Sequence, residues 1–306
     1  MVFLKSAACA FLTVILVAVG ATSVTATEPP NVLSNSSSIK QAVLGFGTSQ
    51  ATTWDEQNLQ ITGQRGIDVS GWQHTQDQSI NWQAVLDSGV SWVYAKCTDG
   101  SGEGSFTNWG PTDIEQAANL GIRSGCYHYA VPGKTSTDIR VDAINQAKSA
   151  LVPLQTLQNT TLPLALDLED TGGLNAVDTT VWAETFLAYV RSETNTTPWL
   201  YASASFLDEK LVASPILGQF PIWVAAYGTG RSTPPMVPPW ARVVAWQFSS
   251  KGRVDGVGDQ DVDLDISLGD LGSFVADVNK LVPNWSMPIV DPTAISFLPW
   301  VAQSSS

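Results

Sequence analysis

The sequence has few of the groups that several common chemistries require. It contains 2 histidines, His74 and His128, and their spacing fits no zinc-ligand pattern. No glycine-rich loop opens a helix in the manner of a dinucleotide or phosphate site, and no G-x-S-x-G segment supplies a serine nucleophile. Zinc-dependent, nucleotide-dependent and serine-nucleophile activities therefore have no support in the sequence, and we expect no cofactor.

Positive charge is also scarce. Lys and Arg number 15 against 28 Asp and Glu, which gives a formal net charge of −13 at pH 7. Phosphate backbones and anionic membrane surfaces would be repelled by such a chain. We expect no nucleic-acid partner and no membrane partner for the mature chain, so binding has to come from a shaped site.

After the N-terminal segment, no apolar run approaches the ~20 residues that a membrane span requires. Residues 1–26 have the pattern of a secretory signal peptide: Lys5 is the one early charge, residues 7–20 are apolar, and small residues at 24–26 fit cleavage. The sequence therefore predicts a secreted, extracellular protein. We expect it to be a monomer.

Cysteine is rare as well. Cys9 would leave with the signal peptide, so Cys97 and Cys126 remain. An even pair in an oxidising compartment permits one disulfide bond. Two buried free thiols on neighbouring strands are the alternative, because a small apolar cysteine packs well in a core.

The central part of the chain alternates between strand-like and helix-like segments. Residues 27–64 are polar and aperiodic and are predicted to be an N-terminal extension, residues 65–275 a barrel domain, and residues 276–306 a C-terminal tail. Predicted strands are 66–70, 90–97, 125–130, 162–168, 199–203, 221–227, 242–248 and, eighth, around 252–258; predicted helices are 81–88, 112–120, 138–151 and 178–193. This rhythm indicates an α/β fold, a modified TIM-like barrel of eight strands with helices mainly after the first five. An open doubly wound sheet is the alternative.

The most informative segment is LPLALDLE at 162–169. It is a short apolar strand that ends in two carboxylates, Asp167 and Glu169. In a strand, residues two apart share a face and are roughly 6.5 Å apart along the chain. Two such acids are costly to bury, and glycoside hydrolysis is a chemistry that uses a carboxyl pair. A structural acid pair bonded to amides or to an arginine is the alternative.

Further acids and aromatic residues follow other predicted strands. Asp68 ends the first strand, Asp99 follows the second, and Asp263 lies beyond the eighth. In barrels of this kind the reactive groups lie at the carboxyl ends of the strands. The aromatic residues near the same ends suit the apolar faces of sugar rings and are predicted to bind substrate: Trp72, Tyr127, Tyr201, Trp223, Tyr227 and Trp246.

An ordered set of motifs resembles a known family. GIDVSGWQ (66–73), YAKCTDG (94–100), GCYHYA (125–130), LPLALDLE (162–169), WLYAS (199–203), WVAAY (223–227), WQF (246–248) and VDLD (262–265) look like those of the glycoside hydrolase family 25 lysozymes, the Chalaropsis-type N-acetylmuramidases. The resemblance spans residues 65–269. It implies a barrel whose later strands lack helices, and cleavage of the β-1,4 bond between N-acetylmuramic acid and N-acetylglucosamine in bacterial peptidoglycan.

The resemblance also implies residue roles. Glu169 matches the general acid, Asp167 its partner, and Asp68 and Asp263 the supporting acids. Tyr127 matches the tyrosine of the third strand. The family usually has Glu where this chain has Asp99, one methylene shorter, and Ala where it has Cys97. These departures put the contact of Asp99 with substrate in doubt.

The predicted mechanism assigns the proton to Glu169. Burial and the like charge of Asp167 would raise the pKa of Glu169, while Asp167 stays ionised.

Three other functions fit parts of the sequence. They are a glycan-binding protein that no longer cleaves, an enzyme acting on chitin-like polymers, and a calcium or metal protein suggested by Asp261, Asp263 and Asp265, whose run lacks the glycine and final glutamate of a calcium-binding hand.

Overall fold

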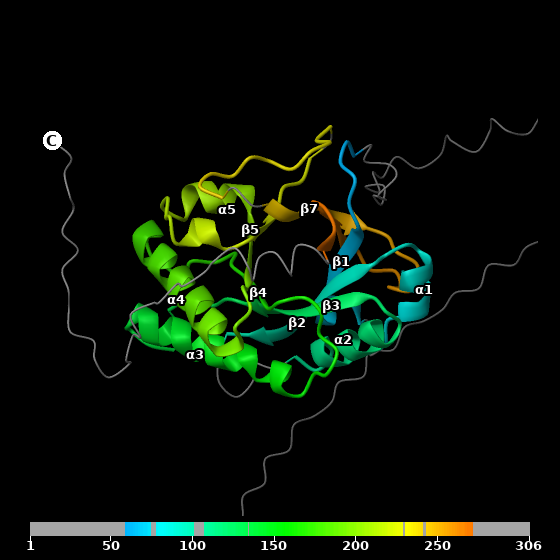
Figure 1. Cartoon of the computed structure of the whole chain (residues 1–306), viewed down its shortest axis with the longest axis horizontal. Helices are drawn as coiled ribbons and strands as arrows, with labels where there is room; N and C mark the ends of the chain where they lie inside the picture. Colours follow the sequence, from blue (N-terminus) through cyan, green and yellow to red (C-terminus); the bar gives the residue numbers. More distant parts are fainter. Residues whose placement is uncertain are drawn as a thin grey trace, which may run out of the picture. The chain divides into compact units, whose positions relative to one another are not determined.

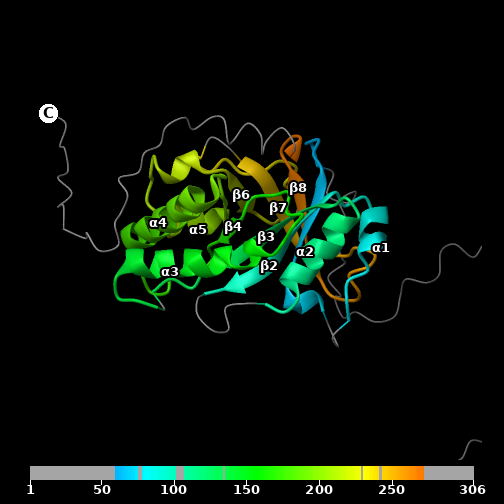
Figure 2. The same ribbon diagram turned by 60° about the horizontal axis from the view of Figure 1, so that its bottom comes forward.

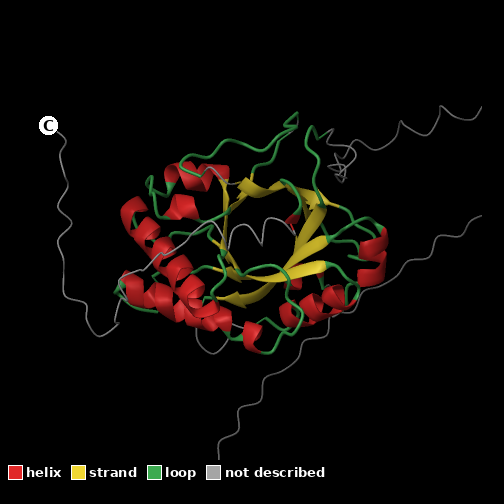
Figure 3. Ribbon diagram, in the orientation of Figure 1, coloured by secondary structure: helices red, strands yellow, loops and turns green. Residues whose placement is uncertain are grey.

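Eight strands close into one barrel in the computed structural model, which describes residues 59–74, 78–100, 107–133, 135–228, 230–240 and 243–271 (Figures 1 and 3). Neighbours in the barrel are neighbours in sequence, from β1 round to β8, and β1 to β7 run parallel. β8 is antiparallel to both β7 and β1. The strands are β1 (Arg65–Val69), β2 (Trp92–Asp99), β3 (Arg123–Tyr129), β4 (Ala165–Asp167), β5 (Trp199–Ser203), β6 (Ile222–Ala225), β7 (Val243–Gly252) and β8 (Val262–Ser267).

The helices follow the first five strands and lie outside the barrel, as predicted. They are α1 (Trp82–Asp87), α2 (Gly110–Asn119), α3 (Ile139–Leu151), α4 (Ala176–Thr194) and α5 (Ala204–Glu209), with short 3₁₀ turns at Gly71–Gln73, Pro153–Gln155 and Leu217–Gln219. α3 and α4 lie side by side (Figures 1 and 2). Asn81, Asp138 and Asn175 start α1, α3 and α4 because each side chain accepts a bond from a free backbone amide of the first turn.

Each strand is buried on both faces, so alternate residues belong to two different cores. Val93, Leu166 and Val224 point outward and pack in the larger core beneath the helices. The inward residues form a second core, in which Trp92 contacts Trp223 across the barrel at a ring-centroid distance of 6.0 Å. The alternation therefore fixes which side chains can reach the open end of the barrel.

Two details of the predicted barrel were wrong. The eighth strand is not 252–258: β7 continues to Gly252, and the residues after it form turns in which Gly256 and Gly258 have positive φ values of 97° and 77°. The strand is Val262–Ser267, whose polar positions face inward rather than outward. The sheet also departs from the wholly parallel arrangement of a TIM barrel, since a loop at 253–261 instead of a helical crossover joins β7 to β8.

The described structure begins before the predicted domain boundary. Leu59 and Ile61 pack against the outer core, and the Gln64 amide donates to Ser267 Oγ at 2.9 Å. The predicted signal peptide at 1–26 and the predicted tail at 276–306 lie outside the described residues, as does most of the extension at 27–64. Within the described ranges, no helix combines the length and apolar character that crossing a bilayer requires.

Candidate active site

One end of the barrel holds a cavity of about 310 Å³. The inward positions at the ends of β1, β4 and β8 place Asp68, Asp167 and Asp263 in its wall, and Glu169 follows β4. Asp263 reaches the same end as the others because β8 is antiparallel, which sets it opposite Asp68 in the β1–β8 register. The four acids predicted to be catalytic therefore converge, although they come from three strands far apart in sequence.

The Asp167 and Glu169 side chains lie close enough for a carboxyl–carboxyl hydrogen bond, which forms only when the two share one proton. Asp167 is buried and its Oδ1 has no hydrogen-bond partner among the described residues, whereas Glu169 is exposed at the mouth. Burial raises the pKa of Asp167 well above its usual range, and the neighbouring Glu169 charge raises it further.

The pKa of Glu169 is also raised by loss of hydration, but the bond from Asp167 and the Lys96 ammonium oppose this rise. The pKa values of both acids are thus raised, that of the more deeply buried Asp167 well above its usual range. The sequence-based mechanism raised only the pKa of Glu169 and kept Asp167 ionised, and the depth of Asp167 at the end of β4 is the reason for the difference.

Asp68 forms the floor of the cavity within a polar network. Gln247 Nε2 donates to Asp68 Oδ2 at 2.6 Å, and Gln247 Oε1 accepts from the Tyr201 hydroxyl at 2.7 Å. Asp265, fully buried below, is hydrogen-bonded to Asp68 and accepts from Trp223 Nε1 at 2.7 Å. Burial, followed by the charges of Asp263 and Asp265, raises the pKa of Asp68 well above its usual range.

Asp263 is the acid best suited to change charge in the neutral range. Loss of hydration, then the charges of Glu169 and Asp261, raise its pKa to about 7. Asp261 is bonded to Arg253 at the rim. Of the three aspartates suggested as a calcium site, Asp261 and Asp265 thus have separate partners, and no group of three metal-ligating side chains with suitable geometry occurs within the described parts of the chain.

Most of the predicted aromatic residues line the cavity. Tyr127, Tyr201 and Trp223 form its wall, and Trp72 stands at the rim with 80% of its surface exposed. Such an exposed tryptophan at a polar cavity is a platform for the apolar face of a ligand. Trp72 is carried by the 3₁₀ turn Gly71–Gln73, which Ser70 caps.

Trp246 is not part of the site. It is 1% exposed, points outward from β7 into the outer core, and its Nε1 donates to the Ala226 carbonyl at 2.9 Å. Its predicted role in substrate binding is therefore corrected, because its neighbour Gln247 occupies the inward position. Tyr227 does not line the cavity either, but its hydroxyl donates to Gln247 Oε1 at the edge of the network.

Asp99 lies beside the cavity rather than in its wall. Its Oδ2 accepts from Lys96 Nζ at 3.0 Å, and it is Lys96 that lines the cavity. The lining residues that the sequence did not single out are Val69, Ser70, Gln73, Lys96, Tyr129, Gln247 and Ser250. Strand alternation would have found Lys96, since it lies two residues after the inward-facing Tyr94.

Both histidines are buried outside the cavity. His128 bonds Thr98 Oγ1 at 2.8 Å and Gln146 Oε1 at 3.3 Å, and burial lowers its pKa to about 4. His74 bonds Asp113 Oδ2 at 2.8 Å. The cysteines form a disulfide between β2 and β3, Cys97–Cys126, with a Cα–Cα distance of 5.4 Å, which settles the alternative between a disulfide and free thiols.

Comparison with known proteins gives consistent matches. The model of the family described as "Glycosyl hydrolases family 25" matches residues 67–257. "Lysozyme M1" of Streptomyces globisporus is 31% identical over 233 residues, 71% of this chain and 72% of that protein.

Two solved structures share the fold. The bacterial lysozyme from Streptomyces coelicolor has a TM-score of 0.58 at 28% identity, covering 72% of this chain and 99% of that one. The Clostridium perfringens spore cortex lytic enzyme SleM has a TM-score of 0.58 at 27% identity, covering 69% of each chain.

Proposed function

Because the chain belongs to the glycosyl hydrolases of family 25 and carries their fold, we propose that it hydrolyses the β-1,4 bond between N-acetylmuramic acid and N-acetylglucosamine in bacterial peptidoglycan. The observation that carries the proposal is the Asp167–Glu169 pair, two neighbouring carboxyl groups with raised pKa values at the open end of the barrel, in which Asp167 Oδ1 has no hydrogen-bond partner among the described residues. An amide N–H, as in the acetamido group of either sugar, would satisfy that oxygen.

The proposed mechanism begins with a transfer of the shared proton. A donor to Asp167 Oδ1 stabilises the ionised form of Asp167, and a sugar over the mouth removes water from Glu169. Both effects move the proton to Glu169, which then donates it to the glycosidic oxygen as the bond to the sugar carbon breaks. Water adds to that carbon and gives a proton back to the Asp167–Glu169 pair, so the sum is hydrolysis and the pair is restored.

The remaining residues bind and polarise the sugar. Asp167, once ionised, faces the positive charge that develops on the reacting ring, and Asp68 and Asp263 lie in the same cavity wall. Trp72, Tyr127, Tyr201 and Trp223 would contact the sugar rings. Asp99 and Tyr227 act through Lys96 and Gln247, with which they are hydrogen-bonded.

The test is a mass analysis of digests of purified peptidoglycan and of chitin. We expect fragments with N-acetylmuramic acid at the new reducing end from peptidoglycan. Glu169→Gln should lose about 10²–10⁴-fold in rate, because a general acid contributes about that much. Glu193→Gln is the matched control, since Glu193 is an exposed glutamate of α4, and its rate should equal that of the parent.

Three results would contradict the proposal. Full activity of Glu169→Gln would remove the assigned acid. Binding of wall fragments without release of reducing ends would favour a glycan-binding protein that does not cleave. Cleavage of chitin in preference to peptidoglycan would favour the chitin-like substrate.

We also propose that the protein is exported and acts as a monomer without nucleic-acid or membrane partners. The signal-like segment at 1–26 supports export, and so does the Cys97–Cys126 disulfide, because such bonds persist in oxidising compartments. N-terminal sequencing of the mature protein should find Thr27 as the first residue, and protein retained in the cytosol with Met1 intact would contradict export.

A further inference from the structure

Lys96 is the one basic side chain among the described residues that line the cavity, where it meets several carboxyl groups. Its side chain is 20% exposed and is held from two directions. Asp99 Oδ2 is 3.0 Å from Lys96 Nζ, and the Tyr129 ring centroid is 5.0 Å from the same nitrogen. The ammonium group is therefore held beside the cavity by an ion pair and a cation–π contact.

A β-bulge in β2 makes this arrangement possible. Lys96 is paired with Tyr127 of β3, but the next pair along is Thr98 with His128, so Cys97 is an extra residue. In a regular strand, residues three apart point to opposite faces. The extra residue restores Asp99 to the face of Lys96, which lets their side chains pair.

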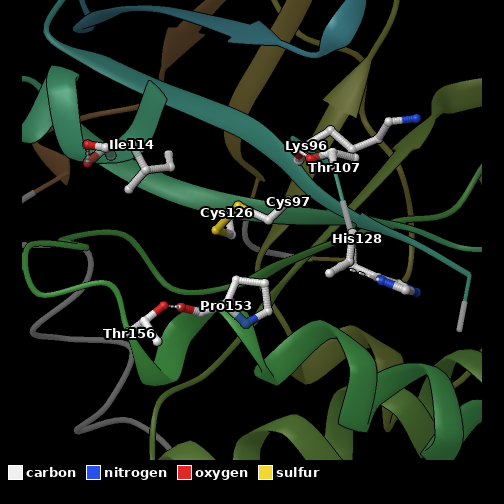
Figure 4. The surroundings of a disulfide bond; sticks show 10 residues. Lys96, Cys97, Thr107, Ile114, Cys126, His128, Pro153 and Thr156 are labelled. Carbon is white, nitrogen blue, oxygen red and sulfur yellow. Dashed lines mark hydrogen bonds between the residues drawn. A yellow bond between two sulfur atoms is a disulfide. The ribbon is translucent and has the colours of Figure 1, made fainter. Parts of the chain in front are cut away.

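Several contacts hold the bulge. Cys97 is bonded to Cys126 on the outward side, and Figure 4 shows Lys96 leaving β2 on the opposite side from this disulfide. Thr107 donates its hydroxyl to the Lys96 carbonyl and its amide to the Cys97 carbonyl at 3.1 Å. Gly110 approaches so closely that an added Cβ would lie 2.1 Å from the Lys96 carbonyl oxygen.

We propose that Lys96 is a positioning residue whose ammonium group, held by Asp99 and Tyr129, keeps a single proton on the Asp167–Glu169 pair, and that Asp99 acts through Lys96 and not on the sugar. The inference rests on the proposed function for its kinetic test. Lys96 lowers the pKa of both Asp167 and Glu169, in keeping with its place in the cavity wall.

The pair needs one proton for the proposed reaction. With two protons, Asp167 has no charge to offer the reacting sugar; with none, Glu169 has no proton to donate. A cation disfavours the second proton, whereas the other charged groups of the cavity favour it. The titratable groups that face Lys96 or the pair are Asp99 from β2, Tyr127 and Tyr129 from β3, Tyr201 from β5, Tyr227 after β6, Asp68 from β1, and Asp261 and Asp263 at β8.

The experiment compares the pH dependence of kcat/KM for peptidoglycan hydrolysis in four variants. Lys96→Gln should move both limbs of the profile to higher pH by about one unit, since an opposite charge at close range has been removed. Lys96→Arg should leave the limbs in place. Asp99→Asn should move them to lower pH by about half a unit, because Lys96 loses its counter-charge. Lys210→Gln removes a lysine of the same charge at the end of α5 and should change nothing.

The profiles of Lys96→Gln and Asp99→Asn should thus shift in opposite directions along the pH axis. A loss of folding cannot produce two opposite shifts. Titration of ¹³C-labelled carboxyl groups by NMR gives the pKa values of the pair without substrate. It therefore tests the role of Lys96 even if the parent cleaves another polymer. Limbs of Lys96→Gln that coincide with the parent, or a shift of Asp99→Asn in the same direction as Lys96→Gln, would overturn the proposal.

Discussion

Gln247 is the residue whose replacement should reveal most about how the cavity floor is held. It is 2% exposed, donates to Asp68, and accepts from the hydroxyls of Tyr201 and Tyr227. Methionine has a similar length and no group able to replace these three bonds. We therefore expect Gln247→Met to leave two buried polar atoms, Asp68 Oδ2 and the Tyr201 hydroxyl oxygen, without their Gln247 partner while changing little in volume.

The magnitude follows from the burial of each partner. A buried polar group left unpaired costs about 1–3 kcal/mol. Asp68 and Tyr201 are 8% and 6% exposed and should both contribute, whereas Tyr227, at 50%, can bond to water. The expected loss in the free energy of unfolding is about 3 kcal/mol, or roughly 6–12 °C in Tm for a domain of this size.

The assay is urea unfolding followed by tryptophan fluorescence at fixed pH. Gln83→Met is the matched control, because Gln83 is an exposed residue of α1 bonded only to Asp87, and its stability should stay within about 0.5 kcal/mol of the parent. A loss below about 1 kcal/mol for Gln247→Met would refute the reasoning, since Asp68 and Tyr201 would then have to be solvated without Gln247.

Three further predictions follow from the site and its frame. Because the pKa of Asp263 is about 7 in the folded state, protonation of Asp263 stabilises the fold, and Tm should rise as pH falls from 7.5 to 5. Asp263→Asn should show a smaller rise. A Tm that falls over this range would contradict the raised pKa. Replacing Cys97 and Cys126 together by alanine should lower the free energy of unfolding by about 3.5 kcal/mol, the loop-closure value for a separation of 29 residues, and an unchanged urea midpoint would contradict it. Trp72→Ala should raise KM with no change in Tm. Trp246→Ala should instead lower the free energy of unfolding by about 3–5 kcal/mol. The reverse pattern would indicate that Trp246, and not Trp72, binds the substrate.

Strand periodicity was enough to predict the barrel and the acid pair, because both depend on local pattern. The apolar run before Asp167 marks a buried strand, and spacing by two residues places Glu169 on the same face. The same rule could not assign Trp246, since a strand buried on both faces has apolar residues at successive positions. Only the inward polar Gln247 distinguishes the two faces, and a lone polar residue there gives little signal.

Two features depended on contacts remote in sequence. The side chain of Asp99 shares a face with Lys96 only because β2 contains an extra residue, and no local pattern in the sequence marks that bulge. β8 has clear alternation, but Asp263 and Asp265 occupy the positions that face the barrel interior. A pattern with acids inside and apolar residues outside resembles a ligand site more than a strand, and it arises because the outward residues Val262, Leu264 and Ile266 pack in the outer core.

The raised pKa values in the cavity bear on how an acidic protein would bind the polymer proposed as its substrate. Burial, together with neighbouring carboxylates, raises the pKa values of Asp68, Asp265 and Asp167, and burial raises that of Glu169. Lys96 adds a positive charge beside them, and a pKa of about 7 leaves Asp263 partly neutral near that pH. The cavity is thus far less negative than its five carboxyl groups suggest, and the repulsion expected from a formal net charge of −13 is reduced where the glycan must enter. Raising the pH above 8 should restore that charge by ionising Asp263 and then the other acids, so binding of wall fragments should weaken with rising pH more steeply at low salt than at high salt.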